Sequence, residues 1–289
     1  MDFEIINPAT TLELLGTINE LQSKHFRFGA GYSDLLMELK KKPEENLVVI
    51  NLSQIKDTAF TGLTISPDHV RMGAMVTAHK IVMNEQLNKD YPVLHQAALT
   101  LASTQIRQVA TVGGNLCTAS PSGDIACALV ALIAHCEIMD STGKTKSIPI
   151  TDFFLGPRKT VIKKNEFLNG VLVSANNKLS KNIYSAFLKI GTRRSMECSV
   201  VSLAYHIQTD DDGDIIHAGV AIGASAPTIR FAKDACDYLI GKRFDHIHQK
   251  EKEEFATKVL SYADPITDIR ATAWYRKEVL YNLSKSIFE

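Results

Sequence analysis

The chain has 289 residues, of which 45% are hydrophobic, and its 32 basic residues balance 32 acidic ones. This length and composition predict a globular protein of about two domains. A formal net charge of zero, without a block of one charge sign, argues against nucleic acid or an anionic membrane surface as a partner.

The first residues, Met1-Asp2-Phe3-Glu4, lack the basic start and apolar core of a signal peptide, and no apolar run approaches the roughly 20 residues that span a bilayer. We therefore expect a cytoplasmic protein.

The five cysteines are widely spaced, which favours reduced thiols and provides no paired ligands for zinc or an iron–sulfur cluster. We expect no metal site on this chain, so any iron–sulfur centre that it needs would lie on a partner.

Hydrophobic periodicity predicts mixed helices and strands in the first 174 residues. Helices are expected at about 12–24, 35–42, 77–87, 93–102 and 124–134, and strands at about 25–28, 47–52, 70–74, 135–140, 146–150 and 168–174. Thr10 and Glu13 stand at capping-box spacing before the first helix.

Beyond about residue 176 the pattern changes to long alternating strands, followed by helices. Strands are expected at 183–190, 198–209 and 215–224, and helices at 232–240, 247–262 and 271–286. This order indicates an α+β domain. We place the boundary at the polar pair Asn176-Asn177, which gives a first domain of 1–176, with subdomains of about 1–54 and 55–176, and a second of 177–289.

The first of two glycine-bearing segments follows a predicted strand and reads Gly29-Ala30-Gly31-Tyr32-Ser33-Asp34. It superficially opens a dinucleotide-binding fingerprint, but the third glycine is missing and the acidic residue expected about twenty positions later is replaced by Asn51. Two interpretations remain open. Successive backbone amides and the Ser33 hydroxyl could hold a diphosphate, or the segment could be an ordinary strand-to-helix turn.

The second segment is expected to be a loop, and it surrounds Gly113 and Gly114 with neutral hydrogen-bond donors. These donors are Thr111, Asn115, Thr118 and Ser120. Glycines allow a close backbone approach, so the cluster suits a phosphate. Asp124 could accept hydrogen bonds from a ribose, or it could cap the helix that follows. Two such segments predict a ligand with two phosphates that lies between two subdomains.

These segments belong to a longer resemblance. The strings Ala102-Ser103-Thr104-Gln105-Ile106-Arg107, Ala110-Thr111-Val112-Gly113-Gly114-Asn115, Ala119-Ser120-Pro121 and Gly123-Asp124 resemble the FAD-binding signature of the flavoprotein subunits of molybdenum hydroxylases. Xanthine, carbon monoxide and nicotinate dehydrogenases represent that family. The resemblance covers nearly the whole chain and implies a two-subdomain FAD-binding region of the p-cresol methylhydroxylase type, then a small three-stranded sheet with helices.

The resemblance also implies the residues that hold FAD. In the first segment these are Arg27, Phe28, Gly29, Ala30, Gly31, Tyr32, Ser33 and Asp34, and in the second they are Ala110, Thr111, Gly113, Gly114, Asn115, Thr118, Ser120 and Asp124. Leu168 falls where the family contacts the flavin ring, and Lys189 lies in a segment near the adenine or flavin end. Two positions depart from the family. Tyr32 replaces a glycine and Glu197 replaces an aspartate.

The implied function is electron transfer. Electrons would pass from a molybdopterin centre on a large partner, through two 2Fe-2S clusters on a small partner, to FAD on this chain and then to NAD or another acceptor. No side chain is expected to act as a catalytic acid or base, since the nine histidines show no ligand or triad spacing. The alternatives are a stand-alone flavin oxidoreductase, which needs a larger substrate domain, and a nucleotide-binding module without redox function.

Overall fold

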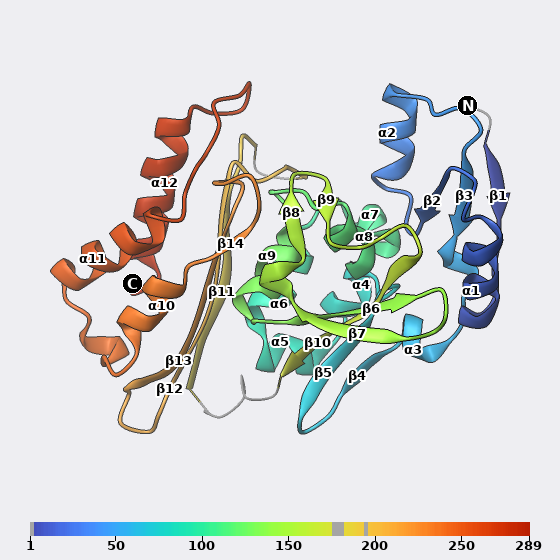
Figure 1. The fold of residues 1–289 in the computed structure, drawn as a ribbon. Coiled ribbons are helices and arrows are strands. Elements are labelled where there is room, and N and C mark those ends of the chain that lie inside the picture. The colour runs from blue at the N-terminus through green and yellow to red at the C-terminus, as the bar shows by residue number, and fades with distance from the viewer. Residues whose placement is uncertain (1–2, 175–181, 194–195) are drawn as a thin grey trace.

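The computed structural model describes residues 3–174, 182–193 and 196–289. The described residues form three successive groups of strands and helices along the chain (Figure 1). Within this part of the chain, no helix is both long enough and apolar enough to cross a lipid bilayer.

The N-terminal group is a small parallel sheet with two crossover helices. Its elements are β1 (Glu4–Ile6), α1 (Thr11–Glu20), β2 (Phe26–Gly29), α2 (Leu35–Lys41) and β3 (Val48–Asn51), with the strand order β1-β3-β2. The Thr10 hydroxyl accepts a hydrogen bond from the Glu13 amide at 3.1 Å and begins α1, as the capping signal predicted. Parallel pairing places the carboxyl ends of the strands at one edge, from which the chain turns into α2.

The second group is a five-stranded antiparallel sheet with helices and a small hairpin. Its strands are β4 (Leu63–Ile65), β5 (His69–Gly73), β10 (Glu166–Ser174), β6 (His135–Asp140) and β7 (Thr145–Pro149) in spatial order, and the hairpin is β8 (Phe154–Gly156) with β9 (Lys159–Thr160). Its helices are α3 (Thr58–Thr61), α4 (Ala78–Val82), α5 (Glu85–Asp90), α6 (Pro92–Thr100), α7 (Thr104–Val109), α8 (Val112–Cys117) and α9 (Asp124–Ala131).

The C-terminal group is an antiparallel sheet covered by helices. Its elements are β11 (Asn182–Ile190), β12 (Val201–Thr209), β13 (Ile215–Gly223), β14 (Arg230–Phe231), α10 (Lys233–Leu239), α11 (Gln249–Leu260) and α12 (Ala273–Ser286). The sheet order is β11-β12-β13-β14, so the three predicted strands gain a two-residue fourth. The helices α10–α12 lie on one face of this sheet, and α6 and α9 lie on the other (Figure 1).

Helix α9 joins the second and C-terminal groups. All eight of its residues are buried. A helix that is covered on every side needs no polar face, which explains why seven of its eight residues are apolar. A Cβ atom added to Gly219 of β13 would lie 1.9 Å from the Ala131 carbonyl oxygen at the end of α9, so this glycine permits the close approach. The apolar residues of α9 therefore share one hydrophobic cluster with Ala204 of β12 and Ala221 of β13.

Most of the predicted elements are confirmed, with shifted ends. The helix predicted at 77–87 is instead two helices, α4 and α5, because Asn84 interrupts it and caps α5 by accepting a hydrogen bond from the Leu87 amide at 2.9 Å. The predicted domain boundary at Asn176-Asn177 lies outside the described residues and stays a prediction.

Candidate functional site

The first glycine segment, residues 29–34, leaves the carboxyl end of β2 and enters α2. Ligands commonly bind at this edge of parallel sheets. A Cβ atom added to Gly31 would lie 1.9 Å from the Val109 carbonyl oxygen. Any side chain at this position would separate β2 from the end of α7, so Gly31 allows the N-terminal and second groups to meet.

Tyr32 occupies the left-handed backbone region, with a φ of +58°. This conformation suits the glycine that the family carries there and strains a tyrosine. The ring folds back over Gly29, where an added Cβ atom would lie 2.5 Å from it, and burial raises the pKa of the Tyr32 hydroxyl. Although Tyr32 replaces a glycine, the turn therefore retains a backbone conformation that is typical of glycine.

The second glycine segment, residues 110–115, is not the loop that we expected, because it runs into α8. Thr111 caps this helix, and its hydroxyl accepts a hydrogen bond from the Gly114 amide at 2.9 Å. The Gly113 amide donates to the Ala74 carbonyl oxygen at 2.8 Å. The amides of both glycines are therefore engaged within the protein, because the Thr111 hydroxyl and the carbonyl oxygen of Ala74, which follows β5, accept their hydrogen bonds.

The two glycines of this segment face different surroundings. A Cβ atom on Gly113 would lie 2.8 Å from the carbonyl oxygen and 2.9 Å from the Cβ atom of Ala74. A Cβ atom on Gly114 would meet only the Thr111 hydroxyl, at 3.0 Å. Gly113 is thus required for packing, whereas Gly114 borders open space.

That open space is a cleft of about 620 Å³ between the two glycine segments. Its volume lies within the range of small-molecule and cofactor sites. The predicted residues that line it are Arg27, Phe28, Ala30, Gly31, Tyr32, Ser33, Asp34, Ala110, Thr111, Gly114, Asn115, Thr118, Ser120 and Asp124. The structure therefore brings together two segments that lie about eighty positions apart in the sequence.

Four predicted residues do not line the cleft. Gly29 lies under the Tyr32 ring, and Gly113 packs on β5. Leu168 belongs to β10 and is only 4% exposed, within the hydrophobic core. Lys189 lies behind Asp124 and reaches the cleft only through that carboxylate.

Further lining residues were not predicted. They are Leu35, Glu38, Leu101, Ala102, Ile106, Cys117, Ser122, Gly123, Arg158, Met196, Glu197 and Cys198. Among them Ala102, Arg158 and Met196 have a positive φ, like Tyr32. Such strained backbone tends to gather at functional sites, and these residue types carry no sequence signal for it.

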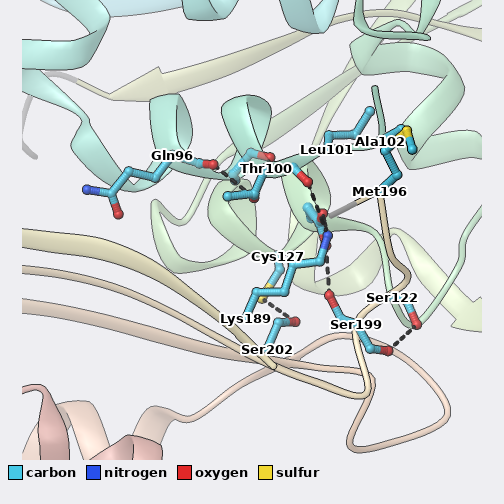
Figure 2. Close-up of polar contacts among 12 residues, drawn as sticks. Gln96, Thr100, Leu101, Ala102, Ser122, Cys127, Lys189, Met196, Ser199 and Ser202 are labelled. Carbon is cyan, nitrogen blue, oxygen red and sulfur yellow. Dashed lines mark hydrogen bonds and ion pairs between the residues drawn. The ribbon is translucent and has the colours of Figure 1, made fainter. Parts of the chain in front are cut away.

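Asp124 lines the cleft and forms a buried ion pair with Lys189, whose side chain Figure 2 shows beside Thr100 and Ser199. The Lys189 ammonium group donates to one Asp124 carboxylate oxygen at 2.6 Å and to the Thr100 carbonyl oxygen at 3.3 Å. The Ser199 hydroxyl donates to the other Asp124 oxygen at 2.9 Å. Burial raises the pKa of Asp124, and the charge of Lys189 opposes that rise. The pair thereby ties β11 to the start of α9.

Asp124 is therefore not the helix cap that we considered. Gly123 holds the N-cap position, and Asp124 is the first residue of α9. A carboxylate in the first helical turn interacts favourably with the helix dipole. Since both of its oxygens already accept hydrogen bonds, its use by a ribose would require sharing them with Lys189 or Ser199.

The Arg27 guanidinium is held by carboxylates as well. It donates to Glu38 at 2.9 Å and to Glu44 at 2.8 Å. Burial alone would lower the pKa of Arg27, but these two hydrogen bonds outweigh it and raise the pKa. Among the residues that the structure describes, the cations that line the cleft, Arg27 and Arg158, are paired with carboxylates, and neutral donors lie beside them.

The cysteines are free thiols, as expected. Cys127 and Cys236 are buried, and burial raises the pKa of each to about 12. Within residues 3–174, 182–193 and 196–289, no group of three or more His, Cys, Asp or Glu side chains could hold a metal ion.

Comparison with known proteins connects this cleft with a family. Residues 1–174 match the family model of the FAD binding domain in molybdopterin dehydrogenase, and residues 186–289 match that of the CO dehydrogenase flavoprotein C-terminal domain. The chain is 27% identical to the nicotinate dehydrogenase FAD-subunit of Eubacterium barkeri, covering 99% of this chain and 95% of the relative. It is 26% identical to the xanthine dehydrogenase FAD-binding subunit of Escherichia coli O157:H7, covering 89% and 86%.

Solved structures agree in fold. Carbon monoxide dehydrogenase from Hydrogenophaga pseudoflava superposes with a TM-score of 0.89 at 23% identity, over 99% of this chain and 96% of that chain. Quinoline 2-oxidoreductase from Pseudomonas putida 86 gives a TM-score of 0.87 at 22% identity, over 100% and 96%. The family resemblance and the expected α+β fold class are confirmed. The chain therefore belongs to the flavoproteins of the molybdopterin dehydrogenases, as an FAD-binding medium subunit of the molybdenum hydroxylase family of oxidoreductases.

Proposed function

We propose that this chain passes electrons from partner subunits to an acceptor, within a molybdenum hydroxylase of the xanthine dehydrogenase type. The partners would be a large molybdopterin-binding subunit and a small subunit with two 2Fe-2S clusters, and the acceptor would be NAD or another oxidant. The relatives named as FAD subunits support this assignment, because each name describes one component of a larger dehydrogenase.

The cleft between the two glycine segments is the proposed FAD site, and this is the observation on which the proposal depends. Its lining contains the hydroxyls of Ser33 and Ser120 and the amide of Asn115, which can donate to phosphate oxygens. Gly31 and Gly114 add no side chains to the space between them. A dinucleotide with two phosphates fits such a lining.

The chain's own contribution is binding and positioning. Bound FAD would supply the redox chemistry, and the residues would fix where that chemistry occurs. Ile106, Leu101 and Met196 add apolar surface to the lining, which suits an aromatic ring better than a phosphate. Lys189 and Ser199 hold the Asp124 carboxylate in a fixed orientation within the lining.

Isolation of the native protein tests the proposal. We expect a yellow chain that contains FAD and co-purifies with a molybdopterin protein and an iron–sulfur protein. Reduction of the complex by its substrate should bleach the flavin, whereas the same substrate should leave the isolated FAD-loaded chain oxidised. A colourless chain that refuses added FAD would contradict the site. Turnover of an organic donor by the isolated chain would instead favour a stand-alone flavin oxidoreductase.

A further inference from the structure

The β8–β9 hairpin carries a cation to the mouth of the cleft. Arg158 lies in its turn, and both terminal guanidinium nitrogens donate to the Asp34 carboxylate, one of them at 3.3 Å. The Thr118 hydroxyl donates to the same carboxylate at 3.5 Å. Asp34 precedes α2, whereas Thr118 ends α8, so this carboxylate joins the two walls of the cleft.

The orientation of Asp34 is unusual for its position. An aspartate at a helix N-cap normally accepts a hydrogen bond from the first turn of its own helix. Asp34 stands at the N-cap of α2 and makes no such bond. Its carboxylate points to Arg158 and Thr118 instead, so the stabilisation that capping would give α2 is forgone for a contact across the cleft.

Arg158 is held for this contact by its backbone. Its φ is +61°, and its amide donates to the carbonyl oxygen of Ala119 at 3.1 Å. Ala119 itself has a φ of +46° and follows Thr118, the C-cap of α8. Two strained residues thus fasten the hairpin to the end of α8, and strain of this kind persists only where the surroundings enforce it.

From this geometry we infer that Arg158 is a positioning residue that closes the cleft through Asp34 and slows the release of bound FAD. The inference rests on the proposed FAD site. It assigns Arg158 a partner on the protein, because both of its terminal nitrogens donate to Asp34. We call the Asp34–Arg158 contact the rim bridge.

The rim bridge should act on rates more than on folding. The side chains of Arg158 and Asp34 are 54% and 44% exposed, so solvent weakens their attraction. Salt at physiological strength screens exposed charges over about 8 Å. Breaking the rim bridge should therefore change the free energy of unfolding little. It should nevertheless separate the segment before α2 from the β8–β9 hairpin, and the cofactor would leave between them.

The test measures FAD release from the loaded full-length chain by flavin fluorescence after dilution. We compare wild type, Arg158→Gln, Asp34→Asn and the double variant, at low and high salt. Each single change should accelerate release about two- to fivefold, and the double variant should be no faster. Salt should accelerate release from wild type and have little effect on the variants.

Lys233→Gln is the matched control, since it breaks an exposed ion pair with Asp237 on α10, outside the cleft lining, and should leave release unchanged. Acceleration by Arg158→Gln that persists in the Asp34→Asn background would overturn the bridge, and would mean that Arg158 acts through the ligand or through Glu38, whose carboxylate lies 3.7 Å from it. Unchanged release in both single variants would also overturn it. A wild-type chain that holds no FAD would overturn the proposed function as well, which separates the two failures.

Discussion

Gly114→Val is the sharpest probe of the cofactor position. A Cβ atom at residue 114 meets only the Thr111 hydroxyl, at 3.0 Å, and the residue lines the cleft. The valine side chain would therefore extend into the space that we assign to the diphosphate. Overfilling a packed site costs about 1–3 kcal/mol, which corresponds to FAD binding that is about 5- to 150-fold weaker.

The neighbouring glycine provides the matched control. A Cβ atom on Gly113 would lie within 3 Å of two atoms of Ala74, one of them a backbone oxygen. Gly113→Ala should therefore destabilise the fold by about 1–3 kcal/mol, although its side chain would not enter the cleft. Substitutions at these two adjacent residues of α8 are thus expected to affect different quantities: the one at Gly114 weakens FAD binding, and the one at Gly113 lowers the stability of the fold.

Two measurements separate these effects. Titration of the apoprotein with FAD gives the dissociation constant, and thermal unfolding of the same apoprotein gives the stability. Gly114→Val should change the first and leave the melting temperature close to wild type, whereas Gly113→Ala should lower the melting temperature. If Gly114→Val bound FAD with wild-type affinity, the diphosphate would not lie against α8, and our placement of the cofactor would be wrong.

Three further changes test the surroundings of the cleft. In thermal unfolding, Tyr32→Gly should be more stable than Tyr32→Ala by about 1 kcal/mol. Both variants lose the ring, but only glycine adopts the φ of +58° without strain. If the alanine variant were the more stable of the two, Tyr32 would not be strained. Lys189→Met should lower the free energy of unfolding by about 3–5 kcal/mol near neutral pH, since it leaves the Asp124 carboxylate buried without its cation. The charge of Lys189 opposes the rise in the pKa of Asp124, so its loss should raise that pKa further, and Asp124 of the variant should take up a proton before that of wild type as pH falls. Protonation removes the penalty, so the two free energies of urea unfolding should converge as pH falls, and a constant difference would contradict the assignment. Arg276→Met should lower the free energy of chemical unfolding by about 2–4 kcal/mol, because the buried guanidinium donates to the carbonyl oxygens of Val200 and Ala224 at 2.6 and 2.9 Å. An unchanged unfolding midpoint would show that water replaces the guanidinium in these hydrogen bonds.

Long elements could be predicted because their signals are local. The nine-residue strands β11, β12 and β13 alternate or carry β-branched residues along their whole length, and α12 shows a capping threonine, Thr272, before its first turn. Strands of two or three residues, such as β1, β4, β9 and β14, were missed. Their pairing depends on partners far away in the sequence, so a short window contains no information on them.

The site was only partly predictable for a similar reason. The glycine segments were found from their own residues and agreed with a family signature, but α8 was taken for a loop because Gly113 and Gly114 are poor helix formers. Its stability comes from the Thr111 cap and from β5, which no local pattern reveals. Arg158 and Met196 enter the cleft from distant turns with left-handed backbone, which ordinary residue preferences disfavour.

The pairing of charges around the cleft indicates how a dianionic cofactor can be held by a chain without net charge. Arg27 is neutralised by Glu38 and Glu44, and Lys189 by Asp124. Binding would then depend on neutral donors and close backbone approach, which salt affects weakly. Opening the rim bridge would speed entry as well as release, so salt should change the exchange rate of FAD more than its affinity. An affinity that falls steeply with salt would instead require an unpaired cation at the phosphates, whereas Arg27 and Lys189 are both paired with carboxylates.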